Sequence, residues 1–242
     1  MIEILLLSII QGITEFIPVS SSSHLIIFSK YLDYESQSLI VDVSLHIGSF
    51  LAVITFFYKE IINFVINKAL FFKIILSSIP VMIIGFFLVE LNLIDSLRNI
   101  KVIAWMTIVF GILLYVSDKF KLSKDLNNNF TLKNALVIGL FQVLSLIPGV
   151  SRSGITITGA RFLNFKRVDA SKISFLMSIP VLGAISIFGL RELYSTNDLN
   201  LSIVSLTSII FSFICSLITI KFFLIYVKKS SLLIFVIYRI LL

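Results

Sequence analysis

The sequence predicts an all-α polytopic membrane protein with two inverted-topology repeats, each a re-entrant broken-helix hairpin followed by three transmembrane helices. Three observations predict it. The chain of 242 residues is 58% hydrophobic and only 14% charged, which is more apolar side chain than a soluble domain can bury. Two of its apolar runs are interrupted by proline and a cluster of serines, and the two breaks lie 130 residues apart. We therefore expect residues 1–242 to form a single integral membrane domain.

The charged residues and the cysteine exclude several other classes of protein. The formal net charge is +7, but Lys and Arg stand in short gaps between apolar runs, so they indicate membrane orientation and no nucleic acid partner. The single cysteine, Cys215, lies in an apolar run, which excludes disulfides and cysteine-based metal sites. The N-terminal run has neither a preceding basic region nor a small-residue cleavage site, so we expect no cleaved signal peptide.

The first repeat begins with a helix that cannot cross the membrane alone. Residues 2–18 are apolar but are interrupted by Pro18 and by the serines Ser20–Ser23, and a full span needs about 20 residues. Residues 24–32 can return to the same side, which gives a re-entrant hairpin. Full spans are expected to follow at about 39–57, 74–90 and 101–117.

The second repeat has the same order of elements. The most polar stretch, 118–131, separates repeat 1 (about 1–117) from repeat 2 (about 131–242). Residues 132–148 are apolar and end at Pro148, where the polar segment GVSRSGITITG begins. Further spans are expected at about 171–190, 201–227 and 231–242.

The two breaks align when the chain is shifted by 130 residues. Pro18 then falls on Pro148, and Ser21 falls on Ser151. A hairpin that returns to its own side, followed by three crossings, leaves the second repeat starting on the opposite side from the first. The repeats are therefore expected to be inverted, which brings the two broken hairpins together near the middle of the membrane.

The distribution of Lys and Arg supports this topology with both termini outside. The segments expected inside hold fourteen Lys or Arg residues and the loops expected outside hold four, as the positive-inside rule requires. The inside segments are 58–73, 117–133, 161–172 and 221–230, and the outside loops are 28–38, 90–101 and 191–200.

The first break, QGITEFIPVSSSSHL, carries groups suited to phosphate chemistry. Gln11 and Glu15 are spaced i, i+4, so they share one helix face and can present oxygen ligands together. Ser20–Ser23 supply hydroxyls and, at the start of a returning helix, free backbone N–H groups. His24 adds acid–base or metal-ligating capacity.

The second break supplies the positive charge that the first lacks. The loop Gly149–Gly154 contains glycines that permit close backbone approach, and it contains Arg152. Helix N-termini, an arginine fork and hydroxyls together are typical of a phosphate-binding site. Composition and spacing therefore indicate a phosphate site embedded in the membrane.

Structural alternatives exist for the same residues. Glu15 and Arg152 alone would form an inert buried ion pair, but charges at this depth are costly and these two stand in matched breaks. Asp42 and His46 lie i, i+4 in the next span, where they are candidates to support the site rather than to act on substrate. The pair Tyr238-Arg239 is interpreted as an interfacial anchor of the last helix.

The two motifs resemble those of a known family. EFIPVSSSSHL preceded by Gln11, and PGVSRSGIT (148–156), are similar to the two signature motifs of the undecaprenyl-diphosphatases of the bacitracin-resistance type. VSLHIGSFLAV, SFLMSIPV and the terminal IYRIL also match, so the resemblance covers nearly the whole chain in order. It implies an enzyme of the bacterial plasma (inner) membrane, with an active site opening to the outer, periplasmic side. Such enzymes hydrolyse the C55 lipid undecaprenyl diphosphate to undecaprenyl phosphate and inorganic phosphate, which recycles the lipid carrier for cell-wall synthesis and confers bacitracin resistance.

The resemblance also implies roles for individual residues. Gln11 and Glu15 would hold a divalent cation, Mg²⁺ or Ca²⁺, although Gln11 stands where many members have Glu. Ser22-Ser23 replaces a Thr-Gly or Ser-Gly/Ala pair of the family. The catalytic residues implied are Glu15, Ser21, His24 and Arg152, and the substrate-binding residues are Gln11, Ser20, Gly149, Ser151, Ser153, Gly154 and Thr156.

These residues suggest a mechanism. Arg152 would clamp the diphosphate and neutralise the charge that develops during phosphoryl transfer. Ser21 is the candidate nucleophile, and attack by a water that His24 or Glu15 directs is the rival. His24 would act as general acid or base, and Glu15 as base or metal ligand.

Two further questions stay open at the level of sequence. The expected partners are an isoprenyl diphosphate lipid and membrane lipids, and a homodimer is neither required nor excluded. Inverted repeats with broken helices are also a transporter design, so a transporter or flippase of a lipid phosphate or anion is the alternative function. The gathering of nucleophile, acid–base group and anion clamp favours the enzyme, because transport alone does not need them.

Overall fold

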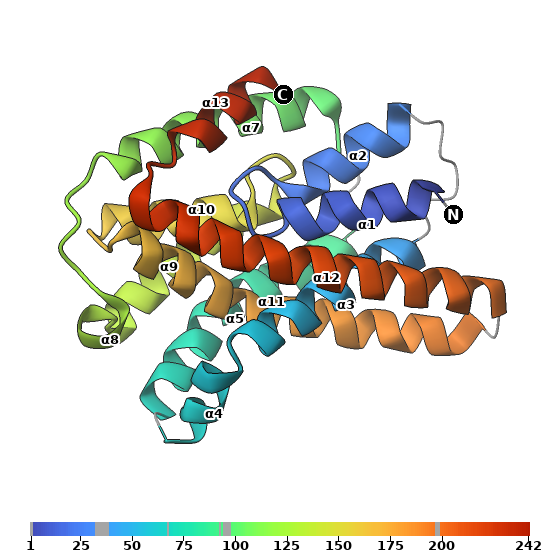
Figure 1. Cartoon of the computed structure of the whole chain (residues 1–242), viewed down its shortest axis with the longest axis horizontal. Helices are drawn as coiled ribbons and strands as arrows, with labels where there is room; N and C mark the ends of the chain where they lie inside the picture. The colour runs from blue at the N-terminus through green and yellow to red at the C-terminus, as the bar shows by residue number, and fades with distance from the viewer. Residues whose placement is uncertain (1, 32–38, 67, 92, 94–97, 197–198) are drawn as a thin grey trace.

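The structure of this chain, a computed structural model, is a bundle of packed helices (Figure 1). Buried apolar side chains form a core between them. It describes residues 2–31, 39–66, 68–91, 93, 98–196 and 199–242. Within these ranges every named element is helical, and the one β contact is an isolated bridge between Lys124 and Phe165. The predicted all-α class is confirmed.

The first repeat shows the predicted break, because its first two helices are short. They have 13 and 11 residues and are separated by the turn that contains Pro18. The helices of this repeat are α1 (Ile2–Thr14), α2 (Ser21–Tyr31), α3 (Leu39–Phe56), α4 (Tyr58–Ile66), α5 (Lys68–Glu90) and α7 (Ile100–Asp118).

The second repeat contains a second pair of short helices around Pro148, followed by two long ones. Helix α8 (Leu126–Asn129) lies in the polar stretch between the repeats. The elements that follow are α9 (Leu132–Val143), the 3₁₀ turn η1 (Leu144–Leu146), α10 (Arg152–Phe162), α11 (Arg167–Thr196), α12 (Leu199–Lys229) and α13 (Leu233–Leu241).

Four helical segments are long and apolar enough to cross a membrane, so the chain is a multi-pass membrane protein. They are 68–90, 100–118, 167–187 and 203–229. The span expected at 231–242 corresponds to α13, which has nine residues. At 1.5 Å per residue these nine residues rise about 14 Å, which is roughly half of the hydrocarbon core. Parts of the loops expected outside, at 32–38, 94–97 and 197–198, lie outside the described residues.

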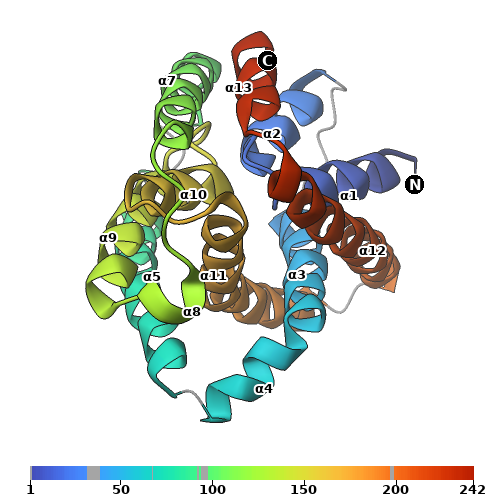
Figure 2. The ribbon, with the colours of Figure 1, turned by 60° about the vertical axis from the view of Figure 1, so that its left-hand side comes forward.

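Helices of the two repeats pack in matching pairs (Figures 1 and 2). Helix α1 packs on α12, and its counterpart α9 packs on α5. Helix α3 packs on α12 in the same way that α11 packs on α5. The counterparts α3 and α11 contact each other, and so do α7 and α13, which lie side by side in both views. Each predicted repeat therefore packs mainly against the other.

A glycine lies in the contact of α1 with α12, and another lies in the contact of α9 with α5. A Cβ atom on Gly12 of α1 would come within 2.5 Å of the Cβ of Cys215 in α12. A Cβ atom on Gly139 of α9 would come within 2.2 Å of the carbonyl oxygen of Ser77 in α5. Both approaches are too close for any larger residue, so small residues set the spacing of these helices, as is common in membranes.

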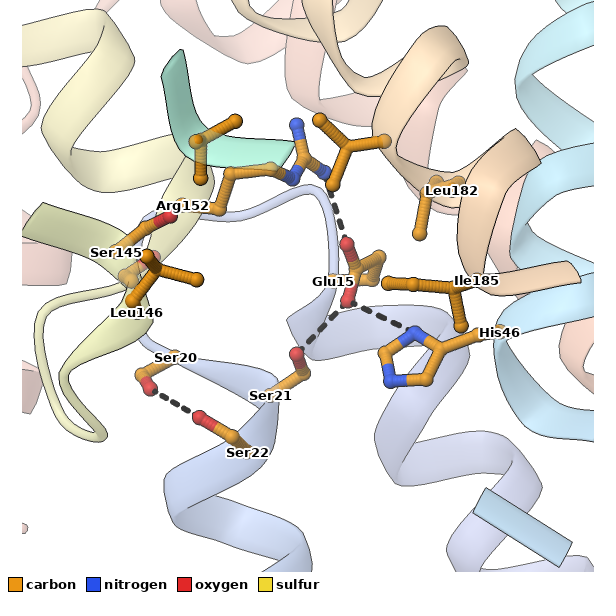
Figure 3. Close-up of a pocket in the computed structure, with 13 residues that line it drawn as sticks. Glu15, Ser20, Ser21, Ser22, His46, Ser145, Leu146, Arg152, Leu182 and Ile185 are labelled. Atoms are coloured by element: carbon orange, nitrogen blue, oxygen red, sulfur yellow. Dashed lines mark hydrogen bonds and ion pairs between the residues drawn. The ribbon is translucent and has the colours of Figure 1, made fainter. Parts of the chain in front are cut away.

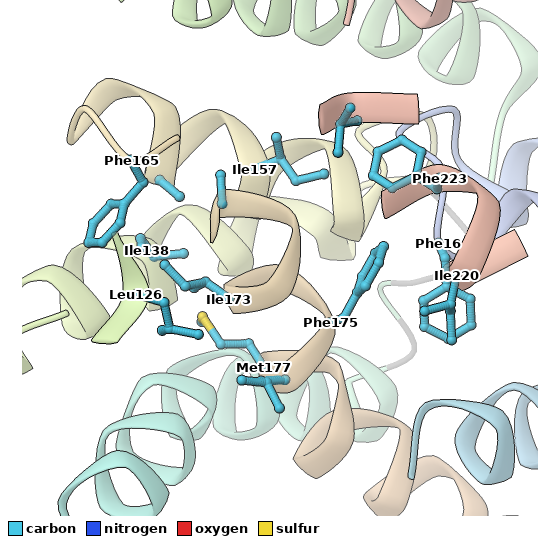
Figure 4. Packing of buried hydrophobic residues seen from close by; sticks show 14 of the residues in the cluster. Phe16, Leu126, Ile138, Ile157, Phe165, Ile173, Phe175, Met177, Ile220 and Phe223 are labelled. Atoms are coloured by element: carbon cyan, nitrogen blue, oxygen red, sulfur yellow. The ribbon is translucent and has the colours of Figure 1, made fainter. Parts of the chain in front are cut away.

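The apolar core holds the first break against α11 (Figure 4). Phe16, which follows α1, is fully buried, and its ring meets that of Phe175 edge-on at a centroid distance of 5.3 Å. Phe175 in turn contacts Phe223 of α12 at 5.8 Å. This packing fixes the position of the residue before Phe16, which is Glu15, relative to α11.

Candidate active site

Residues from both breaks line one cavity of about 180 Å³ (Figure 3). Its polar side comes from the two breaks and from α3, and its apolar side comes from η1, α5 and α11. The lining residues are Glu15, Ser20, Ser21, Ser22, His46, Val81, Ser145, Leu146, Ser151, Arg152, Val181, Leu182 and Ile185. The predicted meeting of the two breaks is therefore present in the structure.

Each break ends in a serine with a left-handed backbone. Ser20 has φ 75° and Ser151 has φ 71°, a region that residues with a side chain rarely adopt. Helix α2 begins at the residue after Ser20, and α10 begins at the residue after Ser151. The Oγ atom of Ser151 caps α10 by accepting a hydrogen bond from the N–H of Gly154 at 3.1 Å.

The backbone corrects the alignment of the two breaks by one residue. The sequence shift placed Ser21 on Ser151, whereas the structure makes Ser20 and Ser151 equivalent, 131 residues apart. The difference arises because an additional residue, Gly149 with φ 97°, follows the second proline. In the corrected alignment Ser21 and Arg152 are equivalent, each as the first residue of its helix.

Glu15 joins the two breaks. Its Oε1 accepts a hydrogen bond from Nη2 of Arg152 at 2.9 Å, and its Oε2 accepts one from Oγ of Ser21 at 2.8 Å. The amide nitrogen of Gln11 also donates to Oε2, at 3.0 Å. The side chains of Glu15 and Arg152 are 6% and 11% exposed, so this charge-assisted contact is largely shielded from solvent.

The surroundings of Arg152 argue against an inert ion pair. Its Nη1 donates to the carbonyl oxygen of Ser174 at 3.2 Å, which fixes the guanidinium on α11. Its Nε is buried and has no hydrogen-bond partner in the described part of the chain. Because Arg152 also lines the cavity, the ion pair is open to a ligand on one side.

Ser153 and Thr156 of the second break form hydrogen bonds within the protein and do not line the cavity. Oγ of Ser153 donates to the carbonyl oxygen of Ile17 at 2.9 Å, which ties the second break to the first. Oγ1 of Thr156 lies 2.8 Å from the carbonyl oxygen of Arg152 and 2.7 Å from Oγ of Ser174. The predicted site residues that do not line the cavity are Gln11, His24, Gly149, Ser153, Gly154 and Thr156.

His24 has both ring nitrogens engaged. Nδ1 lies 2.7 Å from the carbonyl oxygen of Ser20, which can only accept, so the ring proton is on Nδ1. Nε2 then accepts a hydrogen bond from the hydroxyl of Tyr238 at 2.7 Å, and the two rings stack. His24 thus stabilises the left-handed turn at Ser20 and does not itself line the cavity.

Arg239 is a functional candidate that the sequence interpretation missed. Instead of anchoring α13 at an interface, its side chain is only 1% exposed. Its guanidinium donates to the carbonyl oxygens of Gly149 at 2.8 Å, Pro18 at 3.4 Å and Thr107 at 3.0 Å. One buried cation therefore links both breaks to α7. The signal was present in the sequence, because the IYRIL segment belongs to the family resemblance.

The described residues form no ready-made metal site. They contain no group of three or more His, Cys, Asp or Glu side chains placed to share an ion. One observation does fit a cation, since Oε1 of Gln11 is buried without a hydrogen-bond partner in the described part of the chain. With Glu15 it could complete the partial ligand set that Mg²⁺ takes from proteins when substrate phosphates supply the remaining oxygens.

Comparison with known proteins matches the chain over nearly its whole length. The family model described as bacitracin resistance protein BacA matches residues 4–242. The chain belongs to this family. A relative named undecaprenyl-diphosphatase, from Pelagibacter ubique (strain HTCC1062), is 48% identical over 240 residues, which cover 99% of this chain and 93% of the relative. The BacA membership confirms the resemblance found in the sequence motifs.

Two further relatives are also named undecaprenyl-diphosphatase. The protein of Saccharophagus degradans is 42% identical over 253 residues, covering 98% of this chain and 93% of the relative. That of Jannaschia sp. (strain CCS1) is 37% identical over 250 residues, covering 98% and 94%.

Proposed function

We propose that this protein hydrolyses undecaprenyl diphosphate to undecaprenyl phosphate and inorganic phosphate, and so recycles the lipid carrier of cell-wall synthesis and confers bacitracin resistance. The names of its BacA relatives support the substrate. The observation that carries the proposal is the double contact of Glu15, with Ser21 on one oxygen and Arg152 on the other, at the wall of one cavity.

In the reaction, the bond between the terminal phosphorus and the bridging oxygen breaks. Arg152 binds the terminal phosphate and neutralises charge on its oxygens, as phosphoryl transfer requires. Ser21 is the nucleophile, because its hydroxyl already donates to Glu15, the geometry of a nucleophile and its base. Its Oγ bonds to the terminal phosphorus as the bridging oxygen leaves with the lipid phosphate, and water then hydrolyses the phosphoserine, which releases inorganic phosphate and restores Ser21. A water activated by Glu15 is the rival nucleophile, and it would make Ser21 a ligand of the phosphate.

The remaining candidate residues position these groups. His24 holds the turn that presents Ser21, through its contact with the carbonyl oxygen of Ser20. The contacts of Ser153 and Thr156 fix the start of α10, from which Arg152 projects. Mg²⁺ or Ca²⁺ would be held by Glu15 and by Oε1 of Gln11 once the Gln11 amide turns its oxygen, instead of its NH₂ group, towards Glu15. When bound, the cation would supply further positive charge to the diphosphate.

The lipid chain and the orientation complete the proposal. Apolar residues on one side of the cavity suit the isoprenyl units next to the diphosphate, and they are Val81, Leu146, Val181, Leu182 and Ile185. The cavity opens to the outer side in this proposal, which the excess of Lys and Arg in the opposite loops supports. Inverted repeats are supported by the matching pairs of packed helices and by the equivalent turns at Ser20 and Ser151.

Phosphate release by the purified protein tests the function. In detergent, the wild type should liberate inorganic phosphate from an isoprenyl diphosphate. Glu15→Ala and Ser21→Ala should bind the lipid with little change but lose most of kcat, since both groups act on the reacting phosphate. If both variants hydrolyse the substrate at the wild-type rate, the catalytic assignment fails. If the wild type releases no phosphate but moves the lipid between leaflets, transport replaces hydrolysis.

A further inference from the structure

We infer that His46 of α3 is a further catalytic residue, which donates a hydrogen bond from Nε2–H to the diphosphate. This inference rests on the proposed function and adds a group to its site. The sequence offered His46 only as a supporting residue, whereas the structure places its ring in the cavity wall beside Glu15 (Figure 3).

The position of the ring meets the geometric requirement. His46 lines the same cavity as Ser21 and Arg152, and its side chain is 24% exposed. Its Nδ1 lies 3.8 Å from Oε2 of Glu15, the oxygen that accepts the hydroxyl of Ser21. A phosphate that reaches Ser21 and Arg152 therefore comes within range of the imidazole.

The Gln11 amide determines which nitrogen of His46 carries the proton. The Gln11 nitrogen lies 3.0 Å from Oε2 of Glu15 and 2.9 Å from Nδ1 of His46. A carboxylate paired with Arg152 can only accept, so the amide must direct its NH₂ group towards it. The second amide hydrogen then points at Nδ1, which accepts. In the neutral ring the proton is consequently on Nε2.

The Nε2–H group of His46 is available to a ligand. Only Nδ1 of His46 is engaged by a partner within the described residues. His24 is the opposite case, because its proton is on Nδ1 and is committed to the carbonyl oxygen of Ser20. Of the two histidines in the chain, His46 is the one that can offer a donor to the cavity.

The chemistry requires such a donor. When the bond from the terminal phosphorus to the bridging oxygen breaks, its electron pair leaves on the lipid phosphate, where negative charge develops. The proton of the nucleophile goes to Glu15, so His46 has no proton to give or take. It stabilises the developing charge by a hydrogen bond, in the way that oxyanion-hole donors act.

Two substitutions of His46 distinguish hydrogen-bond donation from proton transfer by the imidazole. His46→Gln keeps an N–H group at the same number of bonds from Cα as Nε2, and a neutral amide suffices for a hydrogen bond. His46→Asn keeps an oxygen that can accept from Gln11, but its NH₂ group is one bond closer to Cα, so no donor stands at the position of Nε2. We expect His46→Asn to lower kcat by about 10²–10³-fold, the range for losing one oxyanion-hole donor. His46→Gln should retain kcat within about tenfold of the wild type.

Each outcome bears on the inference. Both variants are measured for phosphate release from an isoprenyl diphosphate in detergent, with thermal unfolding as the check that they fold. Wild-type kcat in His46→Asn would overturn the inference, and so would an equal loss in two folded variants, which would indicate proton transfer by the imidazole. Either result leaves the proposed function intact as long as the wild type releases phosphate and Glu15→Ala does not.

Discussion

The two breaks share a backbone and differ in chemistry. In each, a short helix ends, the chain turns through a serine with positive φ, and a second short helix begins. The residue that starts the second helix is Ser21 in the first break and Arg152 in the second. Equivalent positions of the two repeats thus hold the proposed nucleophile and the proposed anion clamp, and Glu15 contacts both. The same turn therefore places the first residue of the following helix at the site in both breaks, and the identity of that residue determines its chemical role.

Replacing Arg152 tests this division most severely. Arg152→Lys keeps the charge but loses the fork that binds Glu15 and Ser174 at once. We expect kcat for phosphate release to fall by about 10³-fold or more, the magnitude for a catalytic arginine in phosphoryl transfer. Lys172 is an internal control, because it lies in α11 away from the lining residues, and Lys172→Arg should leave kcat unchanged. Near-normal release by Arg152→Lys would rule out the clamp.

Replacing Arg239 should affect both breaks at once, and we expect a smaller loss of kcat than for Arg152→Lys. A lysine cannot reach the carbonyl oxygens of Gly149, Pro18 and Thr107 at the same time. Arg239→Lys should lower the free energy of unfolding by roughly 1–3 kcal/mol, the cost of leaving buried acceptors unpaired. It should also lower kcat about tenfold, because without these hydrogen bonds both turns move by a fraction of an ångström and misplace the groups that act on the phosphate.

Arg161 is the matched control for Arg239. It is also fully buried and also donates to carbonyl oxygens, among them those of Lys121 at 3.3 Å and Asp118 at 3.2 Å, but it does not contact either turn. Arg161→Lys should destabilise the protein to a similar degree and leave kcat unchanged. Equal losses of kcat in the two variants would mean that Arg239 acts through general stability alone.

Much of the architecture follows from the sequence because it is periodic and repeated. Proline and serine inside an apolar run allow few structures in a membrane, so the breaks at Pro18 and Pro148 and the helices around them could be predicted. The meeting of Glu15 and Arg152 at one site could be predicted from the matched breaks, whereas their direct ion pair was considered only as an inert alternative.

What the sequence could not provide depends on contacts between distant segments. The one-residue offset between the breaks depends on the backbone at Gly149, which a proline-to-proline alignment hides. The burial of Arg239 follows from the packing of α13 on α7, and the match of the IYRIL segment to the family does not by itself reveal that burial. The roles of His24 and His46 differ only because of which atoms face their ring nitrogens.

The central claim is that Glu15 of the first break and Arg152 of the second act as one site. A double-mutant cycle on kcat for phosphate release tests it directly, with Glu15→Gln, Arg152→Lys and the double variant compared with the wild type. Residues that act as a unit give strongly non-additive losses, so the double variant should be about as slow as the slower single variant. Losses that add in free energy would show that the two breaks act independently and would contradict this account.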